Sequence, residues 1–324
     1  MRMPAEWAPH ERTLMCWPAR TDLYGAHFAD AKAEHAAVAN AIADFEPVTL
    51  VAHPSQEDEA RAAVSGAVDV VAIPIDDAWA RDSGPIFVTD GERRVGVHFR
   101  FTGWGVKFTP YADDAAFGAR VLEHLREERA DATSFVLEGG SIAVDGEGTL
   151  ITTEQCLLDP SRNPSLDRGG IESRLREHLG VERIVWLGQG LVEDLDTDGH
   201  VDNIFAFVEP GRGLLQTVES EDDPNFASCR ENADRLRAAG LDVVEISALP
   251  RLDGVEEPTV VPYVNFYVAN HALIVPVTGA ETDGEALALL ERLYPGRRAV
   301  PVSGTTLAIG GGGVHCITQQ VPAV

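Results

Sequence analysis

Lysine is almost missing from this chain of 324 residues, which has only Lys32 and Lys107. The 26 basic residues are therefore mostly arginines, and 52 acidic residues bring the formal net charge to −26. A surface this negative repels phosphate backbones and anionic lipids, so we expect no nucleic acid and no membrane as partners, whereas a small cation is attracted. An acidic, lysine-poor composition also suits a salt-rich cytoplasm or a GC-rich genome, and these causes explain most of the charge.

Cysteine is scarce as well, with four residues, and no pair of them has CxxC or zinc-site spacing. We therefore expect reduced thiols and no metal. No apolar run is long enough to cross a bilayer, and the N-terminus carries charges and prolines where a signal peptide has an apolar core. These absences predict a cytoplasmic protein. The length and a hydrophobic content of 44% suffice for one large domain or two smaller ones.

Five stretches have amphipathic or partly buried helical character, and a β-rich run such as PVTLVAH or DVVEIS follows each of them. In one stretch, Ile171, Leu175 and Leu179 recur at every fourth position. The helical stretches are 29–44, 112–129, 165–179, 222–239 and 281–294. Between these units lie five short segments in which small or polar residues adjoin β-branched and aromatic ones: WARDSGPIFV, LEGGSIAV, DGHVDNIFAFV, YVNFYVANHALIV and GGGGVHCITQQ.

One polar residue from each short segment recurs at a nearly regular interval. Asp82, Glu138, His200, Asn265 and Cys316 are separated by 56, 62, 65 and 51 residues. Such a period suggests a closed array of supersecondary units, each sending one strand to a common axis. Because the segments share a pattern rather than letters, an ordinary α/β domain with evenly spaced elements is the alternative. In the array, the polar residues would converge in one central pocket.

A cysteine near the C-terminus and a histidine in the third segment are the candidates for nucleophilic chemistry. His200 and Asp202 are two positions apart, so they share a face if their segment is a strand. By the same rule His315 and Cys316 point to opposite faces, so His315 is a poor base for its neighbour. His200 is therefore the expected partner of the Cys316 thiol.

Adding Asp82 and Glu138 gives a pocket with a thiol, an imidazole and three carboxylates, which is costly to bury unless its guest is a cation. A planar guanidinium fits, because its N–H groups pair with carboxylates in bidentate fashion. Cys316 would attack the guanidinium carbon, His200 would protonate the departing ammonia, and water activated by His200 would release a ureido product. No cofactor is required. The glycines at 310–313 would let the substrate approach the backbone.

Each of these residues also has a purely structural interpretation. Cys316 is as readily an inert thiol as a nucleophile, and His200 alone could be a satisfied polar residue at a strand end. Asp82 follows Arg81 directly, so a structural ion pair remains open. Glu138 precedes two glycines and could serve a turn.

The remaining polar and aromatic residues are interpreted more simply. Asp196 and Asp198 are loop carboxylates, although either could reach the far end of a substrate. Asn265 is interpreted as a strand-packing amide. Core or structural roles are expected by default for Trp17, Trp79, Trp104, His10, His53, His98 and His271.

Five ordered motifs, WARDSGP, LEGGSIAVDGEGTLITTEQCLLDPSRNPSL, DTDGHVDNIFAFV, YVNFYVAN and GGGGVHCITQQ, together resemble the agmatine deiminases of the bacterial-type peptidylarginine deiminase family. The resemblance runs from about Trp7 to the C-terminus. It implies the α/β pentein fold, a five-bladed α/β propeller with pseudo-fivefold symmetry, here as a single catalytic domain over 1–324. It also implies hydrolysis of agmatine to N-carbamoylputrescine and ammonia, a step of polyamine biosynthesis toward putrescine, without a cofactor or metal.

The resemblance assigns roles motif by motif. It implies that Cys316 is the nucleophile, that His200 is the acid and base, and that Glu138 lines the site and orients His200. It implies that Asp82 and Asp202 hold the guanidinium. The implied substrate-binding set is Asp82, Asp202, Trp79, Asp196 and Gly313.

The chain departs from the family pattern at two places. After CWPAR it reads TDLYGAHF, where relatives usually continue with an NWR-like stretch, and Gly313 stands where they usually have Asn. Both places are expected near the pocket mouth, so they bear on which guanidino compound is bound.

Alternative functions are a pentein hydrolase or amidinotransferase for free or methylated arginine, and a non-catalytic cation-binding pentein. A papain-like protease is disfavoured, because its cysteine lies near the mature N-terminus. A homo-oligomer is compatible with the acidic surface, but no particular state is specified.

Overall fold

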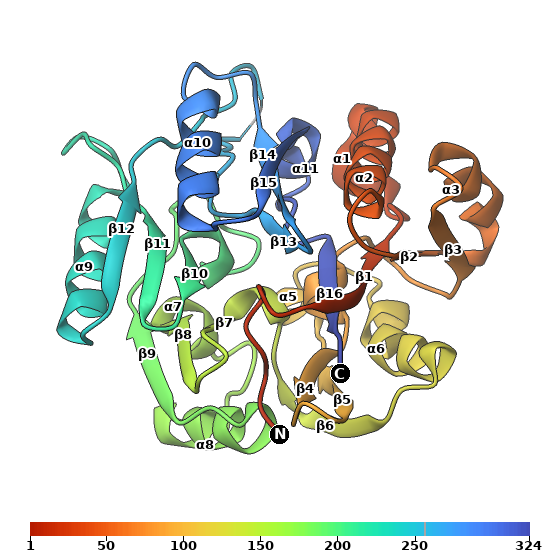
Figure 1. Cartoon of the computed structure of the whole chain (residues 1–324), viewed down its shortest axis with the longest axis horizontal. Helices are drawn as coiled ribbons and strands as arrows, with labels where there is room; N and C mark the ends of the chain where they lie inside the picture. Colours follow the sequence, from red (N-terminus) through yellow and green to blue (C-terminus); the bar gives the residue numbers. More distant parts are fainter. Residues whose placement is uncertain (256) are drawn as a thin grey trace.

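Five small sheets follow one another around a ring (Figure 1) in the computed structural model, which describes residues 1–255 and 257–324. Four sheets have three strands in chain order, and the fifth has four strands in the order β16-β1-β2-β3. The predicted array of five units is therefore confirmed. The five predicted helices are present as well, each within a few residues of its expected bounds.

Each unit combines an antiparallel pair with a parallel pair. In the unit of β10 (Phe205–Glu209), β11 (Arg212–Gln216) and β12 (Asp242–Ile246), β10 and β11 are antiparallel and β11 and β12 are parallel. A short turn joins the antiparallel strands. Helix α9 (Phe226–Ala238) forms the longer crossover that parallel strands require.

Three further units repeat this plan. One contains β4 (Ile86–Thr89), β5 (Arg94–Arg100), α6 (Ala112–Leu125) and β6 (Arg129–Val136). The next contains β7 (Ala143–Val144), β8 (Thr149–Thr153), α8 (Arg168–Leu179) and β9 (Arg183–Leu187). The third contains β13 (Tyr267–Ala269), β14 (Ala272–Val277), α10 (Asp283–Leu293) and β15 (Arg298–Ser303).

The fifth unit joins the two ends of the chain. The C-terminal strand β16 (Thr318–Pro322) pairs antiparallel with β1 (His10–Cys16). The ring thus closes between distant parts of the sequence, and Cys316 lies directly before the closing strand. The rest of this unit is α2 (Phe28–Ala43), β2 (Val48–Ala52), α3 (Glu57–Ala63) and β3 (Val68–Ala72).

The crossover helices bury apolar faces against their sheets. In α8, Ile171, Leu175 and Leu179 are buried, as their spacing predicts. Figure 1 shows β4, β7, β10, β13 and β16 on the inner side of the ring. The short polar segments lie at the starts of these inner strands, so the fold brings them together. Further short α-helices in the described ranges are α1 (Thr21–Tyr24), α4 (Ala80–Ser83), α5 (Gly103–Val106), α7 (Glu154–Leu157) and α11 (Thr305–Ile309).

No helix within the described ranges has both the length and the apolar character needed to cross a bilayer.

Candidate active site

Three charged side chains from two different units meet around Gly140, in the turn that follows Glu138. A Cβ placed on Gly140 would lie 2.7 Å from His200 Nδ1, 2.8 Å from Asp202 Oδ2 and 3.0 Å from Asp82 Oδ1. Real Cβ atoms essentially never approach other atoms more closely than 3.0 Å. A glycine at this position therefore allows an imidazole and two carboxylates to share one small volume.

Helix α4 presents the buried carboxylate of Asp82. Its Oδ2 accepts a hydrogen bond from Trp104 Nε1 at 2.9 Å and lies 3.8 Å from His200 Nδ1. Burial raises the pKa of Asp82, and the neighbouring His200 opposes this rise. The structural ion pair with Arg81 is not formed: among the described residues, the carboxylate partner of the Arg81 guanidinium is Glu6, at 3.4 Å. Trp104, interpreted from the sequence as a core residue, thus also donates a hydrogen bond to Asp82.

His200 precedes a tight turn, Val201–Asn203, that contains Asp202, so the condition that this segment is a strand is not met. Strand β10 begins later, at Phe205. The turn is fixed by Asp194, whose Oδ2 accepts a hydrogen bond from the backbone N–H of His200 at 3.0 Å. Burial lowers the pKa of His200, but Asp82, Cys156 and Asp202 together outweigh burial and raise the pKa well above its usual value. These neighbours therefore favour the protonated imidazole.

Cys316 lies in the turn before β16 and is 5% exposed. Its Sγ is 3.6 Å from Asp202 Oδ2 and 3.4 Å from Asn265 Nδ2. Burial and the charges of Asp202 and Asp82 raise the pKa of Cys316 well above its usual value, so the thiol is neutral in the empty site. Asn265, interpreted from the sequence as a packing amide, contacts the sulfur directly.

The residue before the cysteine also reaches this group of side chains. Residues 314–317 form a turn, so the expectation that His315 and Cys316 alternate as on a strand is wrong. His315 Nδ1 lies 2.9 Å from Asp202 Oδ2, the same oxygen that Cys316 contacts. Both neighbours therefore meet one carboxylate.

Glu138 is fully buried behind His200. Both of its carboxylate oxygens accept hydrogen bonds from Arg162 Nε, at 3.1 and 3.0 Å. Donor atoms of Glu138, Cys156 and His200 lie within 4.8 Å of one another. Because the Arg162 guanidinium already compensates the charge of Glu138, we assign no metal to this cluster. Sequence analysis missed Arg162 and Cys156, since neither has a partner at a telling spacing.

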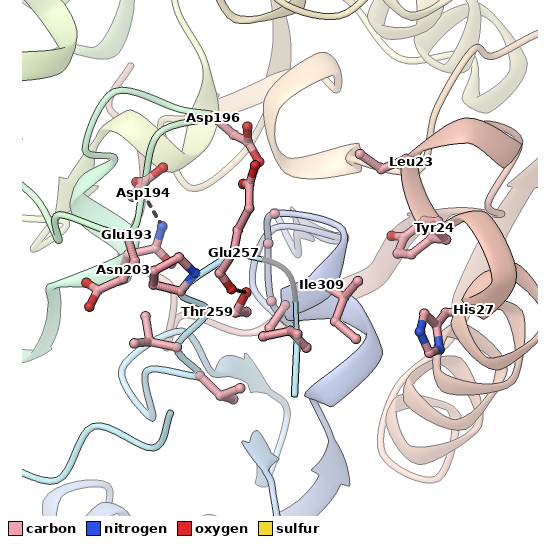
Figure 2. A pocket seen from close by; sticks show the side chains of 18 of the residues that line it. Leu23, Tyr24, His27, Glu193, Asp194, Asp196, Asn203, Glu257, Thr259 and Ile309 are labelled. Atoms are coloured by element: carbon pink, nitrogen blue, oxygen red, sulfur yellow. Dashed lines mark hydrogen bonds between the residues drawn. The ribbon is translucent and has the colours of Figure 1, made fainter. Parts of the chain in front are cut away.

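A cavity of 740 Å³ lies beside the site (Figure 2), and Asn265 and Gly313 are among the residues that line it. A smaller inner cavity reaches Trp79, Asp82, Trp104 and Cys316. Asp196 lines both cavities and so stands between the mouth and the thiol. The segment TDLYGAHF, where the chain departs from the family pattern, forms one wall of the outer cavity through residues 22–27.

Carboxylates dominate the charge of the outer cavity. Figure 2 shows the side chains of Asp196 and Glu257 pointing toward each other. Burial and the charge of the nearby Asp194 raise the pKa of Asp196. Asp198 does not line this cavity. It pairs instead with Lys107 at 2.6 Å and with Arg162 at 2.8 Å. The cavity therefore favours a guest whose outer end is cationic.

The glycine run packs against side chains of the site. A Cβ on Gly312 would lie 2.3 Å from the Trp79 ring, and one on Gly313 would lie 2.3 Å from Asn265 Oδ1. Glycine at these two positions therefore lets Trp79 and Asn265 lie directly against the backbone beside Cys316. Gly313 itself lines the outer cavity.

A family model described as Porphyromonas-type peptidyl-arginine deiminase matches residues 2–322. The chain belongs to this family. An agmatine deiminase of Pseudomonas aeruginosa (strain LESB58) is 44% identical to this chain. The similarity covers 99% of this chain and 95% of that relative.

Solved structures agree with this assignment. An agmatine deiminase of Enterococcus faecalis has a TM-score of 0.94 and 32% identity, over 99% of this chain and 95% of that one. DDAH from Pseudomonas aeruginosa, at 16% identity and a TM-score of 0.54, covers 97% of this chain and 100% of its own, and shares the fold alone. The family resemblance found in the sequence is thus confirmed. The five-bladed pentein fold that it implies is confirmed as well.

Proposed function

We propose that this chain hydrolyses the guanidino group of agmatine to N-carbamoylputrescine and ammonia, with Cys316 as the nucleophile. The observation that carries the proposal is the meeting of His200, Asp202 and Asp82 around Gly140, with the Cys316 sulfur 3.6 Å from Asp202. The agmatine deiminases named above, similar over nearly the whole chain, support the choice of substrate.

Asp82 and Asp202 hold the guanidinium. The Oδ1 atom of Asp202 is buried and has no hydrogen-bond partner within residues 1–255 and 257–324, so it is free to accept a guanidinium N–H. Each charge-assisted hydrogen bond is worth about 1.5–3 kcal/mol. The substrate cation also replaces the repulsion between the two carboxylates by attraction, which favours the ionised form of both.

The bound cation activates the sulfur. Burial and the carboxylates raise the pKa of Cys316, and a guanidinium placed between the carboxylates offsets their effect. The thiol therefore loses its proton to solvent, and the thiolate forms, when substrate arrives. Sulfur then attacks the guanidinium carbon. The protonated His200 donates its proton to the departing nitrogen, and ammonia leaves a thiouronium on Cys316.

Water completes the reaction. His200, now neutral, accepts a proton from water as the water oxygen attacks the thiouronium carbon. Collapse of the adduct breaks the C–S bond and releases the ureido product, while the hydroxyl proton of the adduct passes to the departing sulfur and restores the thiol. Glu138, buried behind His200, holds the imidazole in place. The proposed reaction uses only these side chains and water.

The outer cavity selects the substrate. The amine end of agmatine is a cation and faces the carboxylate of Asp196, with Trp79 and Gly313 along the path to the sulfur. The α-carboxylate of arginine would face the same acidic wall, and juxtaposed like charges cost several kcal/mol. We therefore expect agmatine to be preferred over arginine.

Ammonia release from agmatine and from arginine, measured side by side, tests the proposal. We expect N-carbamoylputrescine as the product of agmatine, and a kcat/KM for arginine at least about 100-fold lower. Equal or faster turnover of arginine would replace the proposed substrate with an amino acid. No ammonia from either compound would refute the hydrolytic function.

We further propose that residues 1–324 act as a single catalytic domain in the cytoplasm. The pairing of β1 with β16 supports one cooperative ring. The four cysteines are free thiols, and a reactive thiol persists in a reducing compartment. A homo-oligomer remains a prediction.

A further inference from the structure

Glu6 and His315 lie beside Asp202, and the proposed reaction gives neither of them a role. Both line a small second cavity, to which Asp202 also contributes. Neither Glu6 nor His315 lines the outer or the inner substrate cavity. The side chain of His315 therefore meets the proposed guanidinium-binding residues at Asp202.

The three residues form a continuous row of close contacts. Glu6 Oε1 lies 2.8 Å from His315 Nε2, and His315 Nδ1 lies 2.9 Å from Asp202 Oδ2. His315 is buried, with 7% of its side chain exposed, whereas the Glu6 side chain is 23% exposed. Both ring nitrogens of His315 thus face carboxylates, which an imidazolium can satisfy by donating at both ends.

The charges around His315 favour its protonated form. Burial and Arg81 lower the pKa of His315, but Glu6 and the hydrogen bond with Asp202 outweigh them and raise it. Burial raises the pKa of Glu6, yet His315 and Arg81 lower it to about 2. The charged and titratable groups that face His315 are therefore Glu6, Arg81, Asp202 and the adjoining Cys316. An imidazolium at His315 would thus lie between two carboxylates.

The backbone around His315 is fixed from two further sides. The N–H of His315 donates to Asn265 Oδ1 at 3.1 Å, and its carbonyl oxygen accepts from Arg81 Nε at 3.3 Å. Arg81 N also donates to the carbonyl oxygen of Cys316 at 3.1 Å. These bonds fix the backbone from which the imidazole projects toward Asp202.

We propose that His315, clamped between Glu6 and Asp202, is a positioning residue that holds Asp202 Oδ2 beside Cys316 and leaves Oδ1 free for the substrate guanidinium. The inference rests on the proposed function, because it assigns Asp202 the task of binding a guanidinium. His315 makes no contact with the substrate cavity and takes no part in proton transfer: the proposed reaction regenerates His200 and Cys316 without it.

Agmatine binding to a protein that cannot react is the first test. In the Cys316→Ser background, calorimetry gives the Kd of agmatine without turnover. His315→Leu removes the hydrogen bond to Asp202, and we expect Kd to rise about 10- to 100-fold. His315→Asn keeps a donor near the position of Nδ1 and should recover most of that loss. A merely space-filling role would make Leu at least as good as Asn.

The second test removes the distant charge. Glu6→Gln retains an acceptor for His315 Nε2 but not the negative charge. We expect the pKa of His315, followed by NMR of labelled histidine, to fall by about 1–3 units. Agmatine binding should therefore begin to weaken at a lower pH in this variant than in the parent. At pH values below that point the Kd should equal that of the parent.

Glu46→Gln is the matched control. Glu46 is also a buried carboxylate that pairs with a histidine, lying 3.0 Å from His10 Nδ1, but it has no contact with Asp202. We expect this variant to lose thermal stability and to keep the pH profile of the parent. A change in the profile equal to that of Glu6→Gln would assign the effect to the loss of a buried charge rather than to His315.

The outcomes separate the inference from the proposed function. If agmatine binds the Cys316→Ser parent and the His315→Leu variant equally well, or if Glu6→Gln leaves the titration of His315 unchanged, the positioning role is wrong and the deiminase function stands. If agmatine does not bind the parent at all and wild type releases no ammonia, the proposed function itself fails.

Discussion

Gly140 has no side chain, and this absence lets three charged groups share one volume. The groups nearest to its missing Cβ are His200, Asp202 and Asp82, at 2.7 to 3.0 Å. All three contacts are with side-chain ends, which can shift by a few tenths of an ångström. Alanine at this position would therefore displace the reacting groups without disrupting the backbone.

We expect Gly140→Ala to lower kcat/KM for agmatine about 100-fold while the melting temperature changes little, because small misplacements of reacting groups cost rate far more than stability. Steady-state kinetics and thermal melts measure the two effects. Gly284→Ala is the control, since a Cβ there meets no atom within 4 Å. An alanine variant at 140 with wild-type kinetics would show that the three groups do not act together.

Asp82 is predicted to act chiefly in binding. Asp82→Asn keeps an acceptor for Trp104 but removes one of the charges that attract the guanidinium. We expect KM for agmatine to rise about tenfold or more, as the loss of one charge-assisted hydrogen bond implies. An unchanged kcat/KM would remove Asp82 from the site.

The chemically important residues of this protein lie in short turns at the ends of helices and strands. Helix α6 begins beside residues 76 and 77, whose backbone N–H groups donate to Asp114 Oδ1 at 2.8 and 3.1 Å. Burial and the nearby Asp77 raise the pKa of Asp114 to about 7. The folded state therefore holds this proton at pH values where the unfolded chain has lost it. The stabilisation is complete below about pH 4 and is lost as the pH rises through 7.

Asp114→Asn keeps the acceptor and cannot ionise, so it removes this pH dependence. We expect the melting temperature of the variant, relative to wild type, to rise by a few degrees between pH 5 and pH 8. Asp113→Asn, on the same turn but only partly buried, should show no such trend. A constant difference between Asp114→Asn and wild type over this pH range would contradict the account.

The order of helices and strands follows from local patterns, and for this reason the sequence predicts it well. Ile171, Leu175 and Leu179 illustrate this, since their period alone identifies α8. The turn that carries His200 could not be found in the same way. Alternation predicts a strand there, but hydrogen bonds to Asp194, from outside the segment, fold it into a turn.

The candidate site was predictable only where one residue type dictates the chemistry. A thiol after four glycines and a His-x-Asp pair are such signals. Arg162 gives none, because its partner Glu138 is distant in sequence and is brought to it by the fold. The regular spacing places Asn265 in the pocket, but it does not predict the contact between the amide and the Cys316 sulfur. The two faces of Asp202, one toward the substrate and one toward His315, follow from the same packing.

The whole molecule depends on closure of the ring by β16. This strand pairs with β1, buries Val321 and holds the turn that carries Cys316. Removing residues 318–324 should lower the free energy of unfolding by on the order of 5 kcal/mol and abolish turnover, because five paired residues and an apolar side chain lose their partners.

Denaturant unfolding and ammonia release measure the effects of this truncation. Removal of Val324 alone, which is 57% exposed, is the control and should be neutral. A shortened chain that folds with the stability of the full chain would show that the other four units stand without the closing strand.

The central claim is that Asp82, Asp202, His200 and Cys316 surround a single guanidinium, and a crystal structure of the Cys316→Ser variant with agmatine tests it most directly. We predict the guanidinium N–H groups within hydrogen-bond distance of both carboxylates, its central carbon against the serine oxygen, and the amine in the outer cavity. Agmatine bound with its amine toward residue 316, or bound away from the two carboxylates, would contradict the claim.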